Sequence, residues 1–467
     1  MIRENRVYDE LNVGDSAELK RLCTADDLFV FAHASGNLNP MHMPGRDVDG
    51  NGTPDTVAPS MWVGSLISAV LGNILPGPGT LYNQQTLRFI GRAHAGEELV
   101  ARVRVVAKEP QYIVRLATSV ERADGTPLVE GEAVVVAPER KLSFDDLSVP
   151  GLLVHRHVHF DRLLEQVAAL DPMLTAVVAP EDPNSLGGAL RAAEAEIITP
   201  ILIGVRPEIE RAAAALRKDI SRYEIIECVD HAVAAKTAVE LVNAGRAHAL
   251  MKGYLHTDEL LGAVVKREGG LRTGRRLTHV FVMDVPGVAT PLLITDAAIN
   301  IAPDLEVKVD IIQNAIDLAL SLGIEQPKVG VLSSVETVNP KIQSSVDAAI
   351  LSKMAERGQI RGGLVDGPLA MDNAVDIGAA RTKGIKSLVA GRAEVLVAPN
   401  LDAGNMLAKE LTFIAHAEGA GIVLGAKVPI VLTSRSDSEK ARLASCAVAV
   451  LHQARLSGHM PMRQAAE

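Results

Sequence analysis

From residue 161 onward, short apolar runs alternate with alanine-rich segments that have the composition of helices. The runs are TAVVAP, PILIGV, HALMKG, HVFVMDV, PLLITDAA, KVGVLSS, EVLVAPN and PIVLTSR. Short buried strands with helices between them are typical of βα units and of mostly parallel sheets. About 300 residues exceed a single hydrophobic core of ordinary size, so we expect two α/β lobes with a cleft between them.

The first part of the chain follows a different pattern. Residues 97–139 show the alternation of antiparallel strands, with a turn at Ala123–Thr126. Two helices are expected before these strands, one after Thr24 and one around Trp62. A helix followed by a long antiparallel sheet is an α+β arrangement. We therefore expect an α+β domain at residues 1–145, a linker at 146–160 and an α/β domain at 161–467.

The aromatic residues support this division. Only 3% of the residues are aromatic, and nine of these 13 side chains lie before residue 161. The remaining four are Tyr223, Tyr254, Phe281 and Phe413. The second domain must therefore build its core from alanine, valine, leucine and isoleucine.

Charge, cysteine count and hydropathy exclude several classes of protein. The net charge is −10, and an acidic chain with few aromatic side chains is a poor partner for nucleic acid. The three cysteines are far apart in sequence, which favours buried reduced thiols in a cytoplasmic protein over disulfides or a zinc site. We expect no membrane span and no signal peptide, because no apolar stretch is long enough and the N-terminus is polar.

One polar motif lies near the start of the first domain. In Ser35-Gly36-Asn37-Leu38-Asn39-Pro40-Met41-His42, Asn37 and His42 flank a tight Asn-Pro turn that can direct both side chains into one pocket. Hydration of a conjugated double bond requires a base for the water and an acid for the α-carbon. A histidine and a carboxylate are able to divide that work.

This motif resembles that of the MaoC-like, or (R)-specific, enoyl-CoA hydratases, in which Gly-Asp-x-Asn-Pro-hydrophobic-His is followed by a long central helix. The resemblance implies a hot-dog fold, in which a sheet wraps around that helix, with catalytic residues at positions 37 and 42. Asn37 replaces the family's aspartate, and an amide cannot take up a proton. We therefore expect hydration to be weakened or absent, leaving a pocket that binds thioesters, or a non-catalytic acyl-CoA-binding or assembly module.

Six sets of polar side chains stand beside apolar runs in the second domain; Arg275 and Arg276 precede their run, and the other sets follow theirs. In such sheets ligands bind at the carboxyl ends of the parallel strands. A hydroxyl and a guanidinium in front of helix-capping residues make a natural phosphate site. The candidate residues are Lys252 and His256, Arg275 and Arg276, Asp296 and Asn300, Asp366 and Asp372, Asn405, and Ser434 with Arg435 and Asp437.

The order KGxxHT, TDAAIN, DGPLxxD, PNLDAGN, TSR resembles the phosphate acetyl/butyryltransferase family. The resemblance implies a two-lobed α/β/α domain similar to isocitrate and isopropylmalate dehydrogenases, and reversible acyl transfer between CoA and phosphate. It places Ser434 and Arg435 on the family's active-site pair. The implied substrates are CoA thioesters, inorganic phosphate and acyl phosphate, and the implied assembly is a homo-oligomer. No permanently bound cofactor or metal is implied.

Two positions depart from the acetyl-specific members of that family. Their Arg-Pro is replaced by Leu260 and Leu261 within Glu259–Gly262, and Ala441 stands in the register of an acidic residue. We expect Arg275 and Arg276 to supply the missing phosphate contact. Asp437 or Asp372 is expected to be the base for the thiol.

Other readings of the motifs are weaker. Gly419–Gly425 is spaced GxGxxxG rather than GxGxxG, so no dinucleotide site is expected there. His155, His157 and His159 alternate, but no further ligand motif accompanies them, so we expect no metal site. A metal-dependent hydroxy-acid dehydrogenase of the same two-lobed fold remains an alternative, although no tight aspartate cluster is evident.

Overall fold

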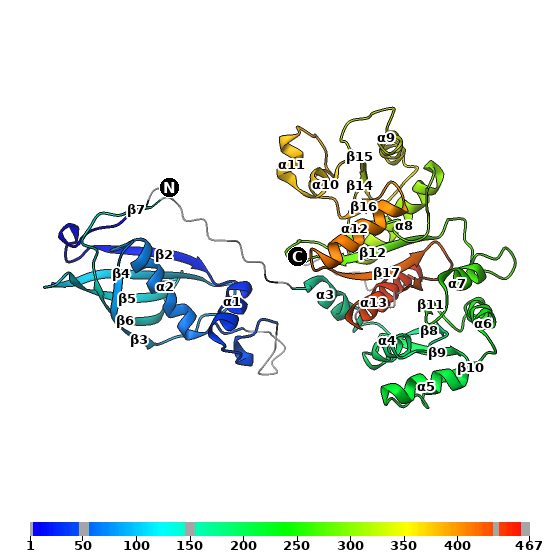
Figure 1. Cartoon of the computed structure of the whole chain (residues 1–467), viewed down its shortest axis with the longest axis horizontal. Coiled ribbons are helices and arrows are strands. Elements are labelled where there is room, and N and C mark those ends of the chain that lie inside the picture. The colour runs from blue at the N-terminus through cyan, green and yellow to red at the C-terminus, as the bar shows by residue number, and fades with distance from the viewer. Residues whose placement is uncertain (1–2, 46–55, 145–153, 155, 433–438, 459–467) are drawn as a thin grey trace. The chain divides into compact units, whose positions relative to one another are not determined.

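The structure is a computed structural model that describes residues 3–45, 56–144, 154, 156–432 and 439–458. The chain divides into two compact units, Met1–Val154 and His155–Glu467 (Figure 1). Each unit has its own hydrophobic core, and each is described separately below.

The first unit is an antiparallel sheet with one long helix packed on it (Figure 1). The five strands have the order β2-β4-β5-β6-β3, and a separate two-stranded pair joins β1 to β7. Its helices and strands are β1 (Arg3–Glu4), β2 (Ser16–Leu22), α1 (Ala25–Ser35), α2 (Ser60–Asn73), β3 (Leu81–Phe89), β4 (Glu98–Glu109), β5 (Ile113–Arg122), β6 (Pro127–Val136) and β7 (Ser143–Phe144). The expected antiparallel hairpin is confirmed as β5 and β6, joined at Ala123–Thr126.

The apolar face of this sheet covers α2. Trp62, Ile67 and Val70 of α2 are buried against alternate residues of β4 and β5, as expected when one face of a sheet packs on a helix. Thr24 caps α1 by accepting the amide of Asp27, whose carboxylate reaches back to the backbone of Thr24. A sheet wrapped around a central helix is the hot-dog arrangement that the sequence implied.

The second unit alternates strands and helices along its length. Its elements are α3 (Val158–Val167), β8 (Met173–Val178), α4 (Pro183–Glu194), β9 (Ile198–Gly204), α5 (Arg206–Leu216), β10 (Glu224–Glu227), α6 (His231–Asn243), β11 (Ala249–Lys252), α7 (Thr257–Val264), β12 (Thr278–Asp284), β13 (Leu292–Thr295), α8 (Leu305–Ser321), β14 (Lys328–Leu332), α9 (Gln343–Glu356), β15 (Leu364–Leu369), α10 (Met371–Val375), α11 (Ile377–Thr382), β16 (Val395–Val397), α12 (Leu401–Phe413), β17 (Glu418–Leu424), β18 (Ile430–Val431) and α13 (Glu439–Leu456).

These strands form one continuous sheet of eleven strands in the order β10-β9-β8-β11-β18-β17-β12-β13-β16-β14-β15. The first lobe is the parallel block from β10 to β18, and the second lobe is the parallel block from β13 to β15. Between them, β17 and β12 are antiparallel to each other and to their neighbours. Two parallel blocks therefore share one sheet through an antiparallel centre.

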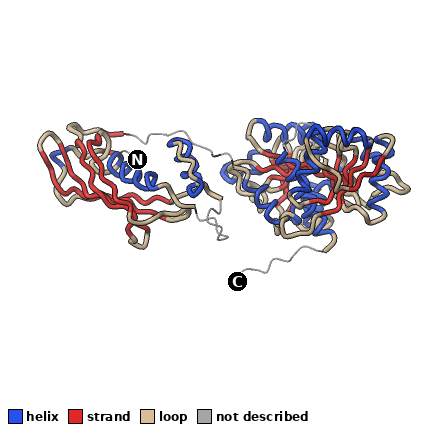
Figure 2. The backbone as a smooth tube through the Cα atoms, turned by 90° about the horizontal axis from the view of Figure 1, so that it is seen from below, coloured by secondary structure: helices blue, strands red, loops and turns tan. Residues whose placement is uncertain are grey.

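Helices cover both faces of this sheet, as Figure 2 shows. On one face, the apolar residues of α3, α4, α5, α8 and α13 form a single cluster with the strands. On the other face, α6 and α7 pack on the first lobe, and α10, α11 and α12 pack on the second lobe. The result is a three-layer α/β/α unit.

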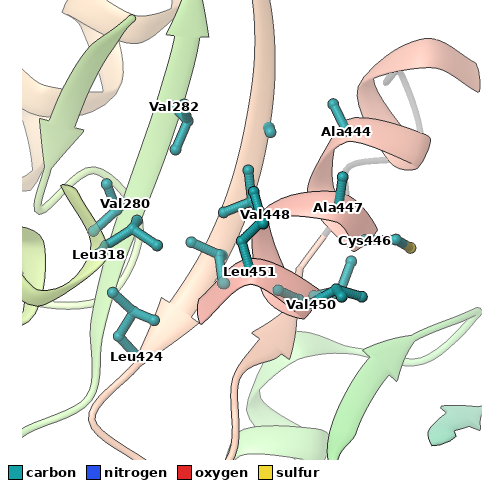
Figure 3. Close-up of a cluster of buried hydrophobic side chains, with 14 of the residues drawn as sticks. Val280, Val282, Leu318, Leu424, Ala444, Cys446, Ala447, Val448, Val450 and Leu451 are labelled. Atoms are coloured by element: carbon teal, nitrogen blue, oxygen red, sulfur yellow. The ribbon is translucent and has the colours of Figure 1, made fainter. Parts of the chain in front are cut away.

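Small side chains allow close packing at the centre of this unit. Figure 3 shows Val448 and Leu451 of α13 pointing toward the strands that carry Val280 and Leu424, and Ala444 and Ala447 belong to the same buried cluster. All three cysteines are free and buried, as expected, and burial raises the pKa of Cys446 to about 12. An alanine-rich helix thus fills the centre of a unit that has few aromatic side chains.

The end of the expected linker is helical, because α3 begins at Val158. His159 is buried, with Nε2 2.8 Å from the carbonyl oxygen of Val288, and His157 Nε2 lies 2.8 Å from the carbonyl of His416. No group of three potential metal ligands occurs among the described residues. Within the same residues, no helix is both long and apolar enough to cross a membrane.

Candidate active site

The loop at residues 252–257 follows β11 and is held against the end of β8. The amide of Gly253 donates to the carbonyl of Val178 at 2.8 Å, and the amide of Tyr254 donates to that of Ala179 at 2.6 Å. A Cβ at position 253 would lie 2.3 Å from the Ala179 oxygen, so only glycine fits. Lys252 and His256 are thereby fixed on either side of this contact, at the carboxyl end of the first lobe.

Asp296 stands at the end of β13 and organises the loop that follows it. Its side chain is 2% exposed, and its oxygens accept from the amides of Ala298 and Ile299 at 2.9 Å. They also accept from the amide of His279 at 3.2 Å and from Asn300 Nδ2 at 2.6 Å. Four donors saturate this carboxylate. Asp296 therefore shapes the loop at 296–300 rather than offering a free carboxylate to a substrate.

Asn300 and Asn405 belong to the same network. Asn300 Nδ2 also donates to the carbonyl of Leu277 at 2.9 Å, and Asn405 Nδ2 donates to that of Ala297 at 3.0 Å. A Cβ at Gly404 would lie 2.3 Å from the Asp296 carbonyl oxygen. The TDAAIN and PNLDAGN motifs are therefore packed directly against each other, which the linear sequence does not show.

Loops of the two lobes meet in one apolar cluster. Leu255 of the loop after β11 is buried in that cluster, and Ile299 and Leu432 pack against it. Leu432 directly follows β18, its amide donates to the carbonyl of Gly421, and it precedes Ser434 and Arg435 in sequence. Ser434, Arg435 and Asp437 themselves lie outside the described residues. The loops at 252–257 and 296–300 and the end of β18 thus border the same apolar cluster.

Arg275 does not join these loops. Its guanidinium pairs with Asp317 of α8 at 2.5 Å and contacts Asn314 Oδ1 at 3.3 Å. It lines a cavity of about 400 Å³ with His452 and Leu456 of α13, on the face of the sheet covered by α8 and α13. Arg276 is exposed, and its amide donates to Asp310. Arg275 therefore has an ion-pair partner in this structure, and its expected phosphate contact stays a prediction.

The two acidic candidates of the second lobe have local partners. Asp366 Oδ1 accepts from the amide of Gly367 at 2.8 Å. A hydrogen bond from the backbone of Asn373 and another from Lys383 lower the pKa of Asp372. Lys383 Nζ lies 3.1 Å from Asp372 and 3.3 Å from Glu336. A carboxylate with a lowered pKa is a weaker base.

Three residues of this unit were not singled out from the sequence. His279 lies within β12, is 1% exposed, and stacks edge-on against Phe281; burial lowers its pKa to about 4. His231 Nε2 lies 2.8 Å from Glu181 Oε2, within hydrogen-bond distance. Glu181 follows the run TAVVAP directly, so the rule applied to the other strand ends would have found it. The hydrophobic pattern of a buried strand does not single out a histidine among its apolar neighbours, so His279 could not be found in this way.

In the first unit, the motif at 37–42 forms two polar turns. Asn37 is exposed and its Oδ1 accepts from the amide of Asn39 at 3.3 Å. His42 Nδ1 lies 2.7 Å from the carbonyl oxygen of Val57, which can only accept. In the neutral ring the proton is therefore on Nδ1, which leaves Nε2 as an acceptor. This tautomer suits a histidine that takes up a proton.

Comparison with known proteins places the second unit in a family. Residues 230–450 match the family described as "Phosphate acetyl/butaryl transferase". The chain is 58% identical over 296 residues to the phosphate acetyltransferase of Rhizobium meliloti, covering 63% of this chain and 94% of that protein.

Two solved structures bear on the two units. A branched-chain phosphotransacylase from Enterococcus faecalis V583 is 32% identical with a TM-score of 0.53, and the match covers 60% of this chain and 99% of that chain. R-hydratase PhaJ1 from Pseudomonas aeruginosa is 37% identical over 33% of this chain and 100% of its own. Its TM-score of 0.32 is below the level at which a likeness bears on fold. From its second unit, the chain belongs to the phosphate acetyl/butyryltransferase family.

Proposed function

We propose that the chain transfers an acetyl or butyryl group reversibly between CoA and inorganic phosphate, at a site formed by the loops that follow β11, β13, β16 and β18. The observation that supports this site is a buried apolar cluster to which Leu255 belongs and against which Ile299 and Leu432 pack, so that loops of both lobes border the same cluster. We expect the two lobes to be arranged as in isocitrate and isopropylmalate dehydrogenases.

The reaction needs a thiolate and an anion site. The CoA sulfur attacks the acyl carbon of the acyl phosphate; the C–S bond forms, and the bond from carbon to the phosphate oxygen breaks with its electron pair leaving on phosphate. The thiol proton passes to a base and finally to the released phosphate. Arg435 and Ser434 are the proposed donors to the phosphate oxygens, where charge develops.

Lys252 and His256 are proposed to bind substrate from the first lobe. Asp296, Asn300 and Asn405 are proposed to shape the facing loop, and Asp366 to support the strand that carries the DGPL motif. Asp372 is already paired with Lys383 and has a lowered pKa, so we favour Asp437 over Asp372 as the base. No resident metal or cofactor enters these steps, and CoA and acyl-CoA act as substrates.

The direct test of the phosphate site is Arg435→Ala. We expect kcat/KM for acyl phosphate to fall by at least about a hundredfold, because a charge-assisted contact to the developing phosphate is lost. The matched control is Arg211→Ala on α5, which removes an exposed arginine paired with Glu208. If Arg435→Ala and Arg211→Ala retain equal activity, the proposed phosphate site is wrong.

For the first unit, we propose a module related to enoyl-CoA hydratases that binds acyl-CoA and hydrates it weakly or not at all. The Gly36–His42 motif, the wrapped sheet and the His42 tautomer support the relation, and Asn37 argues against full activity. The alternative is a purely non-catalytic binding or assembly module. We place the protein in the cytoplasm, where free thiols persist, and expect a homo-oligomer.

Replacement of Asn37 by Asp tests the proposed loss of hydration. With a short 2-enoyl-CoA, Asn37→Asp is expected to raise hydration by about 10²–10⁴-fold over the wild type, because it restores a group able to accept a proton. Addition of His42→Ala should abolish that gain. Robust turnover by the wild type would contradict the proposal, and no gain in Asn37→Asp would favour the assembly module.

A further inference from the structure

A carboxylate–imidazole–carboxylate chain lies at the carboxyl end of the first lobe. His231 Nε2 is 2.8 Å from Glu181 Oε2, and His231 Nδ1 is 3.9 Å from Glu259 Oε2. The other oxygen of Glu181 accepts from the amide of Val205 at 2.9 Å. These residues come from the ends of β8 and β9 and from the first turns of α6 and α7. His231 and Glu181 together therefore connect four separate elements.

The contact between Glu181 and His231 is buried on the Glu181 side and differs in this from a surface ion pair. The Glu181 side chain is only 7% exposed. A Cβ at Gly204 would lie 2.6 Å from Glu181 Oε1, so the glycine at the end of β9 makes room for the carboxylate. A buried carboxylate is costly unless its oxygens are hydrogen-bonded, and His231 Nε2 and the Val205 amide supply one partner to each oxygen.

The series of contacts from Glu181 through His231 to Glu259 ends at the loop that carries Lys252 and His256. Glu259 Oε2 accepts from the amide of His256 at 3.1 Å and so fixes the start of α7. The opposite side of the same loop is held by Val178 and Ala179, which directly precede Pro180 and Glu181. Glu181 and His231 thus support the loop from both of its anchoring segments.

We propose that Glu181 and His231 are positioning residues for acyl transfer, which hold the loop at 252–257 so that Lys252 and His256 face the substrate. The proposal rests on the proposed function of that loop. Glu181 and His231 do not touch the substrate; they act through the strand end at 178–181 and through Glu259. Removal of the imidazole leaves the buried carboxylate of Glu181 without its hydrogen-bond partner and removes the contact between His231 and Glu259.

The test compares four variants of the full-length chain in acyl phosphate-dependent formation of acyl-CoA. His231→Ala removes the bridge, whereas His231→Gln keeps an N–H donor toward Glu181. Gly204→Ala displaces the Glu181 carboxylate by contact and leaves its charge in place. Lys236→Ala is the matched control, because Lys236 lies on the same helix in an exposed pair with Glu240.

We expect His231→Ala and Gly204→Ala to lower kcat/KM by roughly 10- to 100-fold, since a displacement near 1 Å in a positioning element has effects of that order. His231→Gln should recover most of this loss, and Lys236→Ala should behave as wild type. Thermal denaturation of each variant, read at the assay temperature, ensures that only folded protein is compared.

A double-mutant cycle with Lys252→Ala separates positioning from general damage. If His231 acts through the loop, His231→Ala costs much less in the Lys252→Ala background than in the wild type. An equal cost in both backgrounds, or full activity of His231→Ala beside an impaired Lys252→Ala, would overturn the proposal. Full activity of Lys252→Ala would instead remove the proposed role of the loop, and the positioning role with it.

Discussion

Gly404 is required by its contacts and not by its backbone conformation. It lies in α12, where a Cβ would meet the Asp296 carbonyl oxygen at 2.3 Å. Gly262 also lies within a helix, α7, but a Cβ there meets nothing within 4 Å. The two residues therefore form a matched pair for testing whether close packing of the loop after β13 matters.

Gly404→Ala is expected to lower the free energy of unfolding by about 1–3 kcal/mol and to impair acyl transfer, because the added methyl displaces Asp296. Gly262→Ala should instead stabilise the protein by up to about 1 kcal/mol, the usual gain from alanine in a helix. Urea denaturation and kcat/KM measure both effects. Equal behaviour of the two variants would contradict the contact at Gly404.

His452 is a buried histidine that the site does not use. Ser321 Oγ donates its single proton to the carbonyl of Asp317 at 2.8 Å, so at 3.1 Å it must accept from His452 Nδ1. Burial lowers the pKa of His452 to about 4 from its ordinary value of 6.5, against a smaller opposing effect of Asp317. The folded protein therefore resists protonation of this ring.

This lowered pKa predicts acid sensitivity. Between pH 6.5 and 4 the unfolded chain binds a proton at His452 that the folded chain does not, so stability is lost as the pH falls. The loss from this one group is on the order of a few kcal/mol. His452→Asn keeps a donor toward Ser321 but cannot be protonated, so its free energy of unfolding should fall less steeply. Parallel slopes for wild type and variant would exclude this account.

At the scale of elements, α8 and α9 are joined by a buried ion pair. Lys308 Nζ lies 2.6 Å from Asp347, and both side chains are less than 10% exposed. Gln343 Nε2 donates to the second oxygen of Asp347 at 2.7 Å. Removal of one partner leaves an uncompensated charge inside the protein, which costs far more than loss of a surface pair.

Lys308→Ala is therefore expected to lower the free energy of unfolding by about 3–5 kcal/mol. The double replacement Lys308→Met with Asp347→Leu should regain most of it, because no buried charge then remains. Lys353→Ala removes an exposed pair with Glu356 on α9 and should cost less than about 1 kcal/mol. Chemical denaturation distinguishes these values. A double variant as unstable as Lys308→Ala would contradict this interpretation.

The positions of the helices and strands could largely be predicted from the sequence, but the direction of each strand relative to its neighbours could not. The apolar runs after residue 161 became strands, and Thr24 and Trp62 marked the two helices of the first unit. Gly419–Gly425, considered only as a rejected nucleotide motif, contains most of β17 at the centre of the sheet. A Cβ at Gly421 would lie 2.7 Å from the Leu432 oxygen, so its glycines serve packing between β17 and its neighbours.

Across the whole molecule, the lower aromatic content of the second unit accompanies a change of architecture. The first unit packs Trp62 beneath an antiparallel sheet, whereas the second packs alanine-rich helices on an eleven-stranded sheet (Figure 1). Two lobes were expected, but the antiparallel centre that joins them was not. Periodicity reports whether a strand is buried and carries no information about the direction of its neighbours.

Prediction of the candidate site from the sequence has the same limit. Sequence order identified the loops, because polar residues at strand ends have a common reason to gather. It did not show that Asp296 is saturated by four donors or that Arg275 turns to α8. The first fact includes the amide of His279, 17 residues from Asp296, and the second depends on Asp317, 42 residues from Arg275, and only the folded chain brings these partners close.

The most direct test of the central claim is acyl-CoA formation from CoA and a series of acetyl, propionyl and butyryl phosphates, with no metal or nicotinamide added. The thioester product is followed spectrophotometrically with purified full-length protein. We predict turnover with at least one of the three acyl phosphates, and release of acyl phosphate when acyl-CoA and inorganic phosphate are supplied instead. Absence of turnover with all three, in both directions, would contradict the assignment of acyl transfer to this chain.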